Sequence, residues 1–383
     1  MRDSWQRVTI KDIAVVDWGN TSLTKKAYVS SGPFLGVSAA GCDGRMEHAE
    51  HKKDTPVLSA IGAQCGRMFL PQEDFTAIKN TITLTPIDGV SDPVFLYYLL
   101  TFVELPQRGA GQPFISKGDI QKFSVPLPPL EEQRRIVAVL DEAFEGLARA
   151  RAHTEANLKN ARELFERQLA HYFGDPPRDW IRRKLGKITS KVGSGATPKG
   201  GAGAYKADGI SLIRSLNVHD RWFRPKDLAF IDDDQAAKLS NVVVEERDVL
   251  LNITGASVAR CCVAPSDYLP ARVNQHVSII RPDQSVLLPE FLAFMLTSQP
   301  YKDGLLKTGA DNGSTRQALT KALILDLEVS FPADISQQIQ AVDTLRKAEG
   351  KSRELAQAYT AKLQDLDDLR QSLLQKAFAG ELT

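Results

Sequence analysis

The sequence has few cysteines, no strong charge of either sign and no long apolar run. Cysteine occurs at four positions, Cys42, Cys65, Cys261 and Cys262, and never as a C-x-x-C pair. This scarcity argues against a disulfide framework and favours a reduced, cytoplasmic setting. The opening residues, MRDSWQRV, lack the apolar segment of a signal peptide. No stretch is long and apolar enough for a membrane span.

Signatures of nucleotide, methyl-donor and metal sites are also missing. The phosphate-binding motif G-x-x-x-x-G-K-[ST] is absent, and 192–195 form only a lone glycine-rich turn. The GDPPR stretch at 174–178 resembles the D-P-P-Y motif of amino-methyltransferases, but Arg178 stands where an aromatic ring must stack on the target base. His48 and His51 near Cys42 match no common zinc pattern, so a solvated loop is the preferred interpretation. We therefore expect no catalytic site, no metal site and no cofactor on this chain.

The net charge is close to zero. It is +1 for the whole chain, and the largest local excess is 21 Lys/Arg against 18 Asp/Glu in residues 174–330. Affinity for DNA that does not depend on sequence comes mainly from basic groups that neutralise phosphates. The composition therefore predicts weak DNA binding by the chain alone, or binding together with a basic partner.

An internal repeat dominates the chain. Residues 130–173 align without a gap on residues 335–378, at a shift of 205. Each copy carries a stripe at alternating spacings of three and four, which predicts a long amphipathic helix with a coiled-coil seam. At about 1.5 Å per residue, each helix would span on the order of 65 Å. The predicted first stripe contains Val137, Leu140, Phe144, Leu147, Arg151, Thr154, Leu158, Ala161, Phe165, Gln168 and Tyr172.

Charged residues interrupt both seams. Arg151 lies in the first stripe, and Glu349 and Arg370 lie in the second, which runs from Val342 to Ala377. Such interruptions argue against a free-standing coil of many heptads. They favour two helices of one chain that pack on each other and leave part of their surface for partners.

The segments before the long helices also repeat. In residues 1–125 we expect short strands at 34–38, 56–61, 78–84 and 123–127, and an apolar helix at 93–102. Residues 174–330 follow the same order, with an apolar helix at 290–296 and about thirty inserted residues. We predict four parts: a first globular domain at 1–125, a central helix at 126–173, a second globular domain at 174–330 and a C-terminal helix at 331–383. The fold class is α/β (α+β) with a pseudo-twofold repeat and an antiparallel helix pair.

The order and spacing of these parts resemble the specificity subunit of Type I restriction–modification systems. The most specific stretches are 126–140, which contains PLPPLEEQ, and 371–382, which contains LLQKAFAGEL. The second helix departs from the family pattern because it opens with ADISQQIQAV. The resemblance implies a non-catalytic DNA-recognition subunit for phage defence, in which each globular domain recognises one half of a bipartite target.

The resemblance also implies partners. Two modification (methyltransferase) subunits would bring S-adenosylmethionine and adenine methylation, and restriction subunits would bring ATP and Mg²⁺. The helix positions expected to dock partners are matched between the two copies: Gln133, Val137, Leu140, Phe173, Gln338, Val342, Leu345 and Phe378.

Polar loops of the two globular segments are the candidate DNA contacts, because binding residues usually lie on loops of rigid domains. Arg recognises guanine, Asn and Gln recognise adenine, and Ser, Thr and Lys hold phosphates. Candidates in the first segment are Thr24, Lys25, Lys26, Arg45, Gln64, Arg67, Arg108 and Gln112. Candidates in the second are Ser194, Thr197, Lys199, Arg214, Asn217, Asn252, Thr254, Arg260, Asn274, Gln275, Asn312, Ser314, Thr315, Arg316 and Gln317. Of these, 312–317 is favoured most.

Two other functions remain open on the sequence alone. A coiled-coil scaffold whose globular domains bind proteins would fit the near-neutral charge. A self-contained methyltransferase would bind S-adenosylmethionine without a partner. Binding to random duplex at several salt concentrations distinguishes the scaffold, and calorimetry with S-adenosylmethionine distinguishes the methyltransferase.

Overall fold

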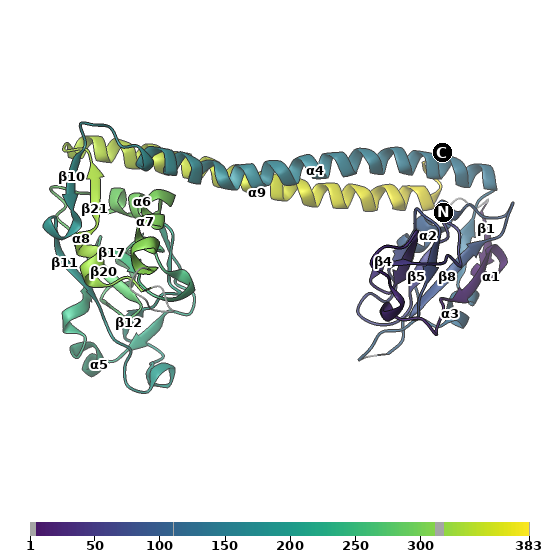
Figure 1. The fold of residues 1–383 in the computed structure, drawn as a ribbon, viewed down its shortest axis with the longest axis horizontal. Helices are drawn as coiled ribbons and strands as arrows, with labels where there is room; N and C mark the ends of the chain where they lie inside the picture. Colours follow the sequence, from purple (N-terminus) through teal and green to yellow (C-terminus); the bar gives the residue numbers. More distant parts are fainter. Residues whose placement is uncertain (1–4, 110, 311–317, 383) are drawn as a thin grey trace. The chain divides into compact units, whose positions relative to one another are not determined.

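The computed structural model describes residues 5–109, 111–310 and 318–382. The chain divides into two compact units (Figure 1). The first unit comprises residues 1–155 and 360–383, and the second comprises residues 156–359. Each unit therefore holds one globular part together with one portion of each long helix. The finer four-part division proposed from the sequence stays a prediction.

The globular part of the first unit is built from small sheets. An antiparallel four-stranded sheet has the order β2-β8-β5-β6, and β3 lies between β4 (antiparallel) and β7 (parallel). Strand β1 pairs with β9. The strands are β1 (Gln6–Thr9), β2 (Ala14–Trp18), β3 (Phe34–Ser38), β4 (Gly41–Met46), β5 (Val57–Ser59), β6 (Met68–Phe69), β7 (Phe75–Ala77), β8 (Thr81–Pro86) and β9 (Ser124–Leu127); the short helices are α1 (Ile10–Ile13), α2 (Pro93–Phe102) and α3 (Lys117–Lys122).

Helix α2 shows why the apolar run forms where it does. Asp92 caps its N-terminus by accepting from the amides of Val94 and Phe95, and Pro93 occupies the first turn. Its buried face, including Phe95 and Leu99, joins the core of the first unit. The helix predicted at 93–102 is therefore confirmed at both ends.

The second unit repeats this plan. Its sheet β11-β20-β17-β18 matches β2-β8-β5-β6, and β15-β12-β19 matches β4-β3-β7 with β16 added at the edge. Its strands are β10 (Ile181–Lys184), β11 (Thr189–Ser194), β12 (Ile210–Ile213), β13 (Val218–His219), β14 (Trp222–Phe223), β15 (Ala229–Ile231), β16 (Val243–Val244), β17 (Val249–Asn252), β18 (Cys261–Val263), β19 (Ala271–Val273), β20 (Val277–Pro282) and β21 (Glu328–Phe331); its short helices are α5 (Asp233–Ala237), α6 (Pro289–Thr297), α7 (Gln299–Ala310) and α8 (Lys321–Asp326).

The inserted residues of the second unit can now be located. The hairpin β13–β14 and helix α5 interrupt the connections that follow β12 and β15. Helix α7 follows α6, whereas an extended segment follows α2 in the first unit. Within the described residues, the insertions therefore add elements around a shared framework and leave the strand order unchanged.

The two long helices form as predicted, as α4 (Leu130–Gly174) and α9 (Ile335–Ala379). In the first unit the beginning of α4 packs with the end of α9, where Arg151 pairs with Asp367. In the second unit the end of α4 packs with the beginning of α9, where the buried Ser352 hydroxyl donates to the carbonyl of Ala161. These pairings make the helices antiparallel.

The predicted seam is wrong near the end of α4. Gln168 was placed in the stripe, but its side chain is exposed and Leu169 is fully buried instead. Beyond Phe165, the buried face of α4 packs into the globular core of the second unit, with Leu169 and Phe173 beside Phe291. At this end of α4 the buried side chains therefore face the globular core, and their spacing no longer keeps the alternation of three and four expected for the helix seam.

Each long helix is fixed at its start by one buried glutamine. Gln133 accepts from the amide of Asp92 (2.8 Å) and donates to the carbonyls of Val90 and Pro128. Gln338 likewise accepts from the amide of Leu288 (2.9 Å) and donates to the carbonyls of Val286 and Pro332. Each amide thus ties the start of a helix to the loop before α2 or α6 and to the segment leading into the helix.

No helix in the described part of the chain combines the length and hydropathy needed to cross a membrane.

Candidate nucleic-acid interface

Backbone hydrogen bonds define the same loop framework in both units. The amide of Ala60 donates to the carbonyl of Asn80, and the amide of Ile253 donates to that of His276 (both 2.9 Å). A β-bridge joins Ile61 to Phe114 in the first unit and Thr254 to Ala318 in the second. The turn after β5 therefore corresponds to the turn after β17, and the turn before β8 to the turn before β20. Six of the candidates from the sequence lie on these turns: Gln64, Arg67, Thr254, Arg260, Asn274 and Gln275.

In the first unit, Asp43 organises one side of this framework. Its carboxylate accepts from Lys25 Nζ (2.5 Å), from the Tyr28 hydroxyl and from Ser38 Oγ (2.9 Å). Burial alone would raise the pKa of Asp43, but these three donors outweigh burial and lower it. The pKa of Tyr28 is raised, mainly by burial and then by Asp43. Lys25 is therefore held in place before any ligand arrives.

A cavity of about 460 Å³ lies beside this cluster. It lies between the β2–β3 loop and the turns after β3 and β7, and its cationic lining residues are Lys25, Lys26 and Lys79. Lys25 and Lys26 are exposed side chains. Lysines gathered on loops in this way provide the charge that phosphate contacts need.

Other candidates of the first unit already have partners within the chain. Arg45 pairs with Glu73 (2.7 Å), and Arg108 pairs with Asp119. Arg67 donates to Gln64 (3.1 Å) and its guanidinium lies over the ring of Phe69 at 5.4 Å. Gln112 is exposed. These arginines lie on the surface, so an ion pair of this kind is weak and does not prevent a DNA contact.

In the second unit, a chain of polar side chains connects three loops. Thr197 donates to Gln275 Oε1. The Gln275 amide nitrogen lies 3.1 Å from His276 Nε2, and His276 Nδ1 lies 2.5 Å from Thr254 Oγ1. Thr197, Gln275 and Thr254 were candidates from the sequence, and His276 was not. We call these four residues the polar relay.

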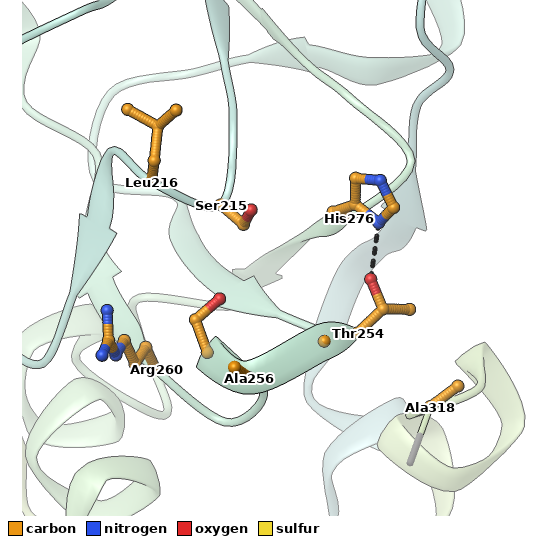
Figure 2. A pocket seen from close by; sticks show the side chains of 9 residues that line it. Ser215, Leu216, Thr254, Ala256, Arg260, His276 and Ala318 are labelled. Carbon is orange, nitrogen blue, oxygen red and sulfur yellow. Dashed lines mark hydrogen bonds between the residues drawn. The ribbon is translucent and has the colours of Figure 1, made fainter. Parts of the chain in front are cut away.

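The relay ends at a cavity of about 720 Å³. Figure 2 shows Thr254 and His276 joined on one side, Ser215 and Leu216 on another, and Arg260 near the short helix η5 (Gly255–Ser257). Its polar lining consists of Thr254, Ser215, Ser257, His276 and Arg260, and the described lining residues include no carboxylate. Gly255 has φ +78, and a Cβ built there meets nothing within 4 Å, so the backbone is open to a ligand.

Three asparagines proposed as DNA contacts are buried. Asn217 accepts from the amide of Arg214 and donates to the carbonyl of Arg224. Asn252 donates to the carbonyl of Ser215 at 2.9 Å, and Asn274 accepts from the amide of His276. Asn217 and Asn252 are 0% exposed and Asn274 is 4% exposed. The structure therefore corrects their role: they hold the loops in shape, because a base edge cannot reach them.

The remaining candidates of the second unit are placed as follows. Lys199 is exposed and lines a cavity of about 450 Å³ with Thr197 and Lys238. The Arg214 guanidinium donates to the carbonyl of Asp227 and lies over the ring of Tyr205 at 5.1 Å. Ser194 is partly buried on β11. The favoured segment 312–317, with Asn312, Ser314, Thr315, Arg316 and Gln317, lies outside the described residues.

The helix residues expected to dock partners lie mostly inside their own units. Gln133, Leu140 and Gln338 are 0% exposed, and Val342, Leu345, Phe173 and Phe378 are below 9%. Val137 is partly exposed. A partner cannot contact buried side chains, so a docking surface would use other positions on the same helices. The exposed apolar side chains there are Val139, Leu164, Ile339, Leu355 and Leu369.

The histidine pair considered for a metal has other surroundings. His51 stacks on Phe75 with ring centroids 5.1 Å apart, and burial lowers the pKa of His51. Within the described residues, no group of three or more His, Cys, Asp or Glu side chains is arranged to hold a metal ion.

Two signals in the sequence could have indicated the missed residues. His276 directly follows Asn274 and Gln275, which were candidates. Extending the internal repeat to this turn would have aligned His276 with Asn80. The carbonyls of these two residues accept equivalent hydrogen bonds, from the amides of Ile253 and Ala60 respectively. Ser215 gave no such signal, because it lies where the second unit begins its inserted hairpin.

Comparison with known proteins agrees with this arrangement. Residues 2–159 match the family model of the Type I restriction modification DNA specificity domain. The chain is 21% identical over 330 residues to the Type I restriction enzyme MjaVIII specificity subunit of Methanocaldococcus jannaschii, covering 80% of this chain and 76% of the relative. It is 25% identical over 294 residues to the EcoBI specificity subunit of Escherichia coli, covering 70% and 60%.

Solved structures share the fold over the full length. A chain from a type I R-M system described for complex assembly and conformational transition superposes with a TM-score of 0.77 at 20% identity, covering 100% of this chain and 99% of that one. The HsdS subunit from Thermoanaerobacter tengcongensis gives 0.61 at 21% identity, with 100% and 98% coverage.

The fold and its loops define a class of protein: a chain with two related globular units, each joined to portions of an antiparallel helix pair and each presenting the same loop framework. Residues 2–159 match the Type I restriction modification DNA specificity domain, and over most of its length the chain is similar to specificity subunits of Type I restriction enzymes.

Proposed function

We propose that each globular part recognises one half of a bipartite DNA target, while the helix pair fixes the spacing between the halves. The observation that carries this proposal is the duplicated loop framework, because one chain then presents two sites of the same architecture. Proteins with two-fold symmetry recognise paired half-sites in this way. The matched family, described as a DNA specificity domain, supports the same assignment.

The chain is a recognition subunit and catalyses no step itself. Two modification subunits dock on the long helices and bind S-adenosylmethionine, and restriction subunits bind ATP and Mg²⁺. Exposed apolar side chains on α4 and α9, such as Leu164 and Leu369, are available to contact such a partner. The near-neutral charge supports recognition in the assembled complex, where basic partners add phosphate contacts.

Methylation mapping tests the two-site recognition. The chain and its modification subunit are expressed together, and methylated adenines are mapped across the genome. We expect a split motif with adenine methylation in both halves. Replacing residues 1–125 by the matching segment of another specificity subunit should change one half and keep the other. Both proteins soluble and bound to each other, with no methylated motif, would refute the proposal.

Truncation tests the docking. A chain ending at Asp334 lacks α9, so the first unit loses Leu374 and Phe378 from its core and the helix pair is lost. We expect co-purification with the modification subunit to fail. Because the truncation also removes core residues, exchanging Leu369 for Glu on an exposed helix face provides a milder variant. Normal assembly of both variants would overturn docking on the helices.

A further inference from the structure

The polar cavity of the second unit differs from the corresponding place in the first unit in its side chains, although the backbone is shared. Thr254 stands where the first unit has Ile61, and His276 stands where it has Asn80. Ala318 corresponds to Phe114 through the same β-bridge. An arginine is common to both: the carbonyls of Arg67 and Arg260 accept equivalent amide bonds from Ser59 and Asn252 (2.8 Å).

A shared frame with different side chains is what two sites with different ligands require. If the two sites bound the same ligand, their lining side chains would be expected to have the same hydrogen-bonding groups on this shared backbone. Ile61 and Phe114 offer only apolar surface, whereas Thr254 offers a hydroxyl tied to the relay. The inference below rests on the proposed recognition of two half-sites.

The polar relay determines what Thr254 offers. Thr197 donates to Gln275 Oε1, so the Gln275 amide nitrogen donates to His276 Nε2. His276 Nε2 then accepts, and in the neutral ring the proton lies on Nδ1 and is donated to Thr254 Oγ1. The Thr254 hydroxyl hydrogen is left free to point into the cavity.

The cavity therefore presents donors at its polar side. Arg260 adds up to five N–H donors, and none of the described residues makes a recorded hydrogen bond or ion pair with its guanidinium. Among the described residues that line the cavity, none is a carboxylate that could accept from an amino group. Leu216, Ala256 and Ala318 are the apolar lining residues, and they lie on different sides of the cavity (Figure 2).

We propose that this cavity receives the major-groove edge of one guanine in the second half-site, contacted by Arg260 and by the Thr254 hydroxyl that His276 and Gln275 orient. Guanine presents two adjacent acceptors, N7 and O6, in that groove, whereas cytosine presents a donor and adenine presents one of each. A phosphate would also accept these donors, and the test below separates a phosphate contact from a guanine contact by its dependence on sequence and salt.

The test uses the assembled complex of this chain with its modification subunits. Methylation mapping first gives the motif. Duplexes are then made in which each guanine of the second half is replaced in turn by 7-deazaguanine, which lacks the N7 acceptor. For the unaltered chain we expect one replacement to weaken binding roughly tenfold. Two variants are measured on the same duplexes, Thr254→Val, which keeps the shape and removes the hydroxyl, and Arg260→Gln.

The pattern of losses decides between the outcomes. We expect both variants to bind the unmodified duplex more weakly than the unaltered chain does. Replacing that one guanine by 7-deazaguanine should then weaken their binding much less than it weakens binding by the unaltered chain. His276→Gln should reduce discrimination with a smaller loss of affinity, because it acts through Thr254. Ser190→Ala is the matched control, since Ser190 is exposed and its hydroxyl makes a long hydrogen bond of 3.4 Å to the carbonyl of Arg281. It should leave every value unchanged.

Three results would overturn the assignment. The first is a second half-site without guanine. The second is the same 7-deazaguanine penalty in the variants as in the unaltered chain. The third is an equal loss on all duplexes with a smaller salt dependence, which indicates a phosphate contact. Absence of any split motif for the unaltered complex would instead refute the proposed function, so the two failures are distinguishable.

Discussion

Each unit attaches its globular part to the long helices through two sets of contacts. One set is the same in both units, and the other is specific to each unit. In both, a buried glutamine at the start of a long helix makes three hydrogen bonds to backbone groups. The first unit adds the Tyr98 hydroxyl, which donates to Asp141 on α4 (2.5 Å). The second unit adds Arg221, which donates to Glu166 on α4 (2.6 Å) and Glu349 on α9 (2.8 Å).

This difference follows from the insertion. Arg221 lies in the turn of hairpin β13–β14, an element that the first unit lacks within its described residues. It adopts φ +67 and its guanidinium lies over the ring of Phe165 at 5.0 Å. The duplicated attachment thus bonds to backbone groups, which any sequence provides, whereas the attachment specific to the second unit uses Arg221, a side chain that came with inserted residues.

The largest effect should come from breaking the common attachment. Replacing Gln338 by Leu leaves the amide of Leu288 and the carbonyls of Val286 and Pro332 without their partner in a buried place. At roughly 1–3 kcal/mol for each unsatisfied buried group, and some relaxation, we expect a loss of about 3 kcal/mol. Hydrogen exchange in peptides from the second unit measures it, and Gln133→Leu should have the same effect in the first unit.

Gln337→Leu is the matched control, because Gln337 is the neighbouring residue and is exposed. It should change the free energy of unfolding by less than about 0.5 kcal/mol. Unequal effects of the two buried glutamines would show that the attachments are not equivalent despite their matching hydrogen bonds.

A smaller effect is expected from the attachment specific to the second unit. Arg221→Met removes the partner of Glu349, which is 21% exposed, and of Glu166, which is 50% exposed. Breaking a fully buried pair costs about 3–5 kcal/mol, and the exposure of Glu166 reduces this, so we expect about 2 kcal/mol. Faster hydrogen exchange should appear in the second unit and leave the first unchanged. Lys226→Met, at an exposed site on the same connection, is the control.

The sequence predicted the repeated architecture well because repetition is visible without geometry. Both long helices begin and end within one residue of the repeated segments 130–173 and 335–378, and the strand at Phe34–Ser38 matches at both ends. The charged residues that interrupt the seams were also informative. Glu349 meets Arg221, and Arg370 lies over the ring of Phe144 at 4.5 Å. The sequence could mark these positions as unusual, but their partners come from other elements.

The candidate site was harder to predict, because residue type does not indicate burial. Asn217 and Asn252 have side chains suited to adenine, yet the amide nitrogen of each donates to a backbone carbonyl of a loop. Asn and Ser form such local bonds as readily as they contact DNA. His276 was missed for the opposite reason: its role depends on Gln275 and Thr254, and Thr254 lies on a different turn. Contacts between turns are set by the sheet and not by spacing along the chain.

The next effect concerns pH and is confined to the first unit. Asp43 has a lowered pKa, so its contribution to stability is present above the ordinary carboxyl pKa and is lost as pH falls through the folded value. Asp43→Asn should cost about 1 kcal/mol at neutral pH, from weakened bonds to Lys25 and Tyr28. The difference from the unaltered chain should shrink as the pH falls below about 4.

Urea unfolding at several pH values measures this difference. Asp88→Asn is the control, because Asp88 is on the same unit and takes part in no recorded ion pair within the described residues. A difference that stays constant from pH 7 to pH 3 would mean that Asp43 acts through shape and not through its charge.

The smallest effect is expected in the helix seam, where the units again differ. In the second unit the seam holds a buried hydroxyl, Ser352, whereas in the first it holds the ion pair of Arg151 and Asp367, whose side chains are 40% and 53% exposed. Exposed ion pairs contribute about 0.2–1 kcal/mol and are screened by salt. Arg151→Ala should therefore cost about 0.5 kcal/mol at low salt and less in 1 M salt. Arg149→Ala removes a comparable pair with Glu145 on α4 alone. If Arg151 helps to set the register of α9 against α4, its replacement should also broaden distances measured between spin labels placed on the two helices of the first unit, and the Arg149 variant should not. Equal behaviour of the two variants would mean that the ion pair adds only local charge balance.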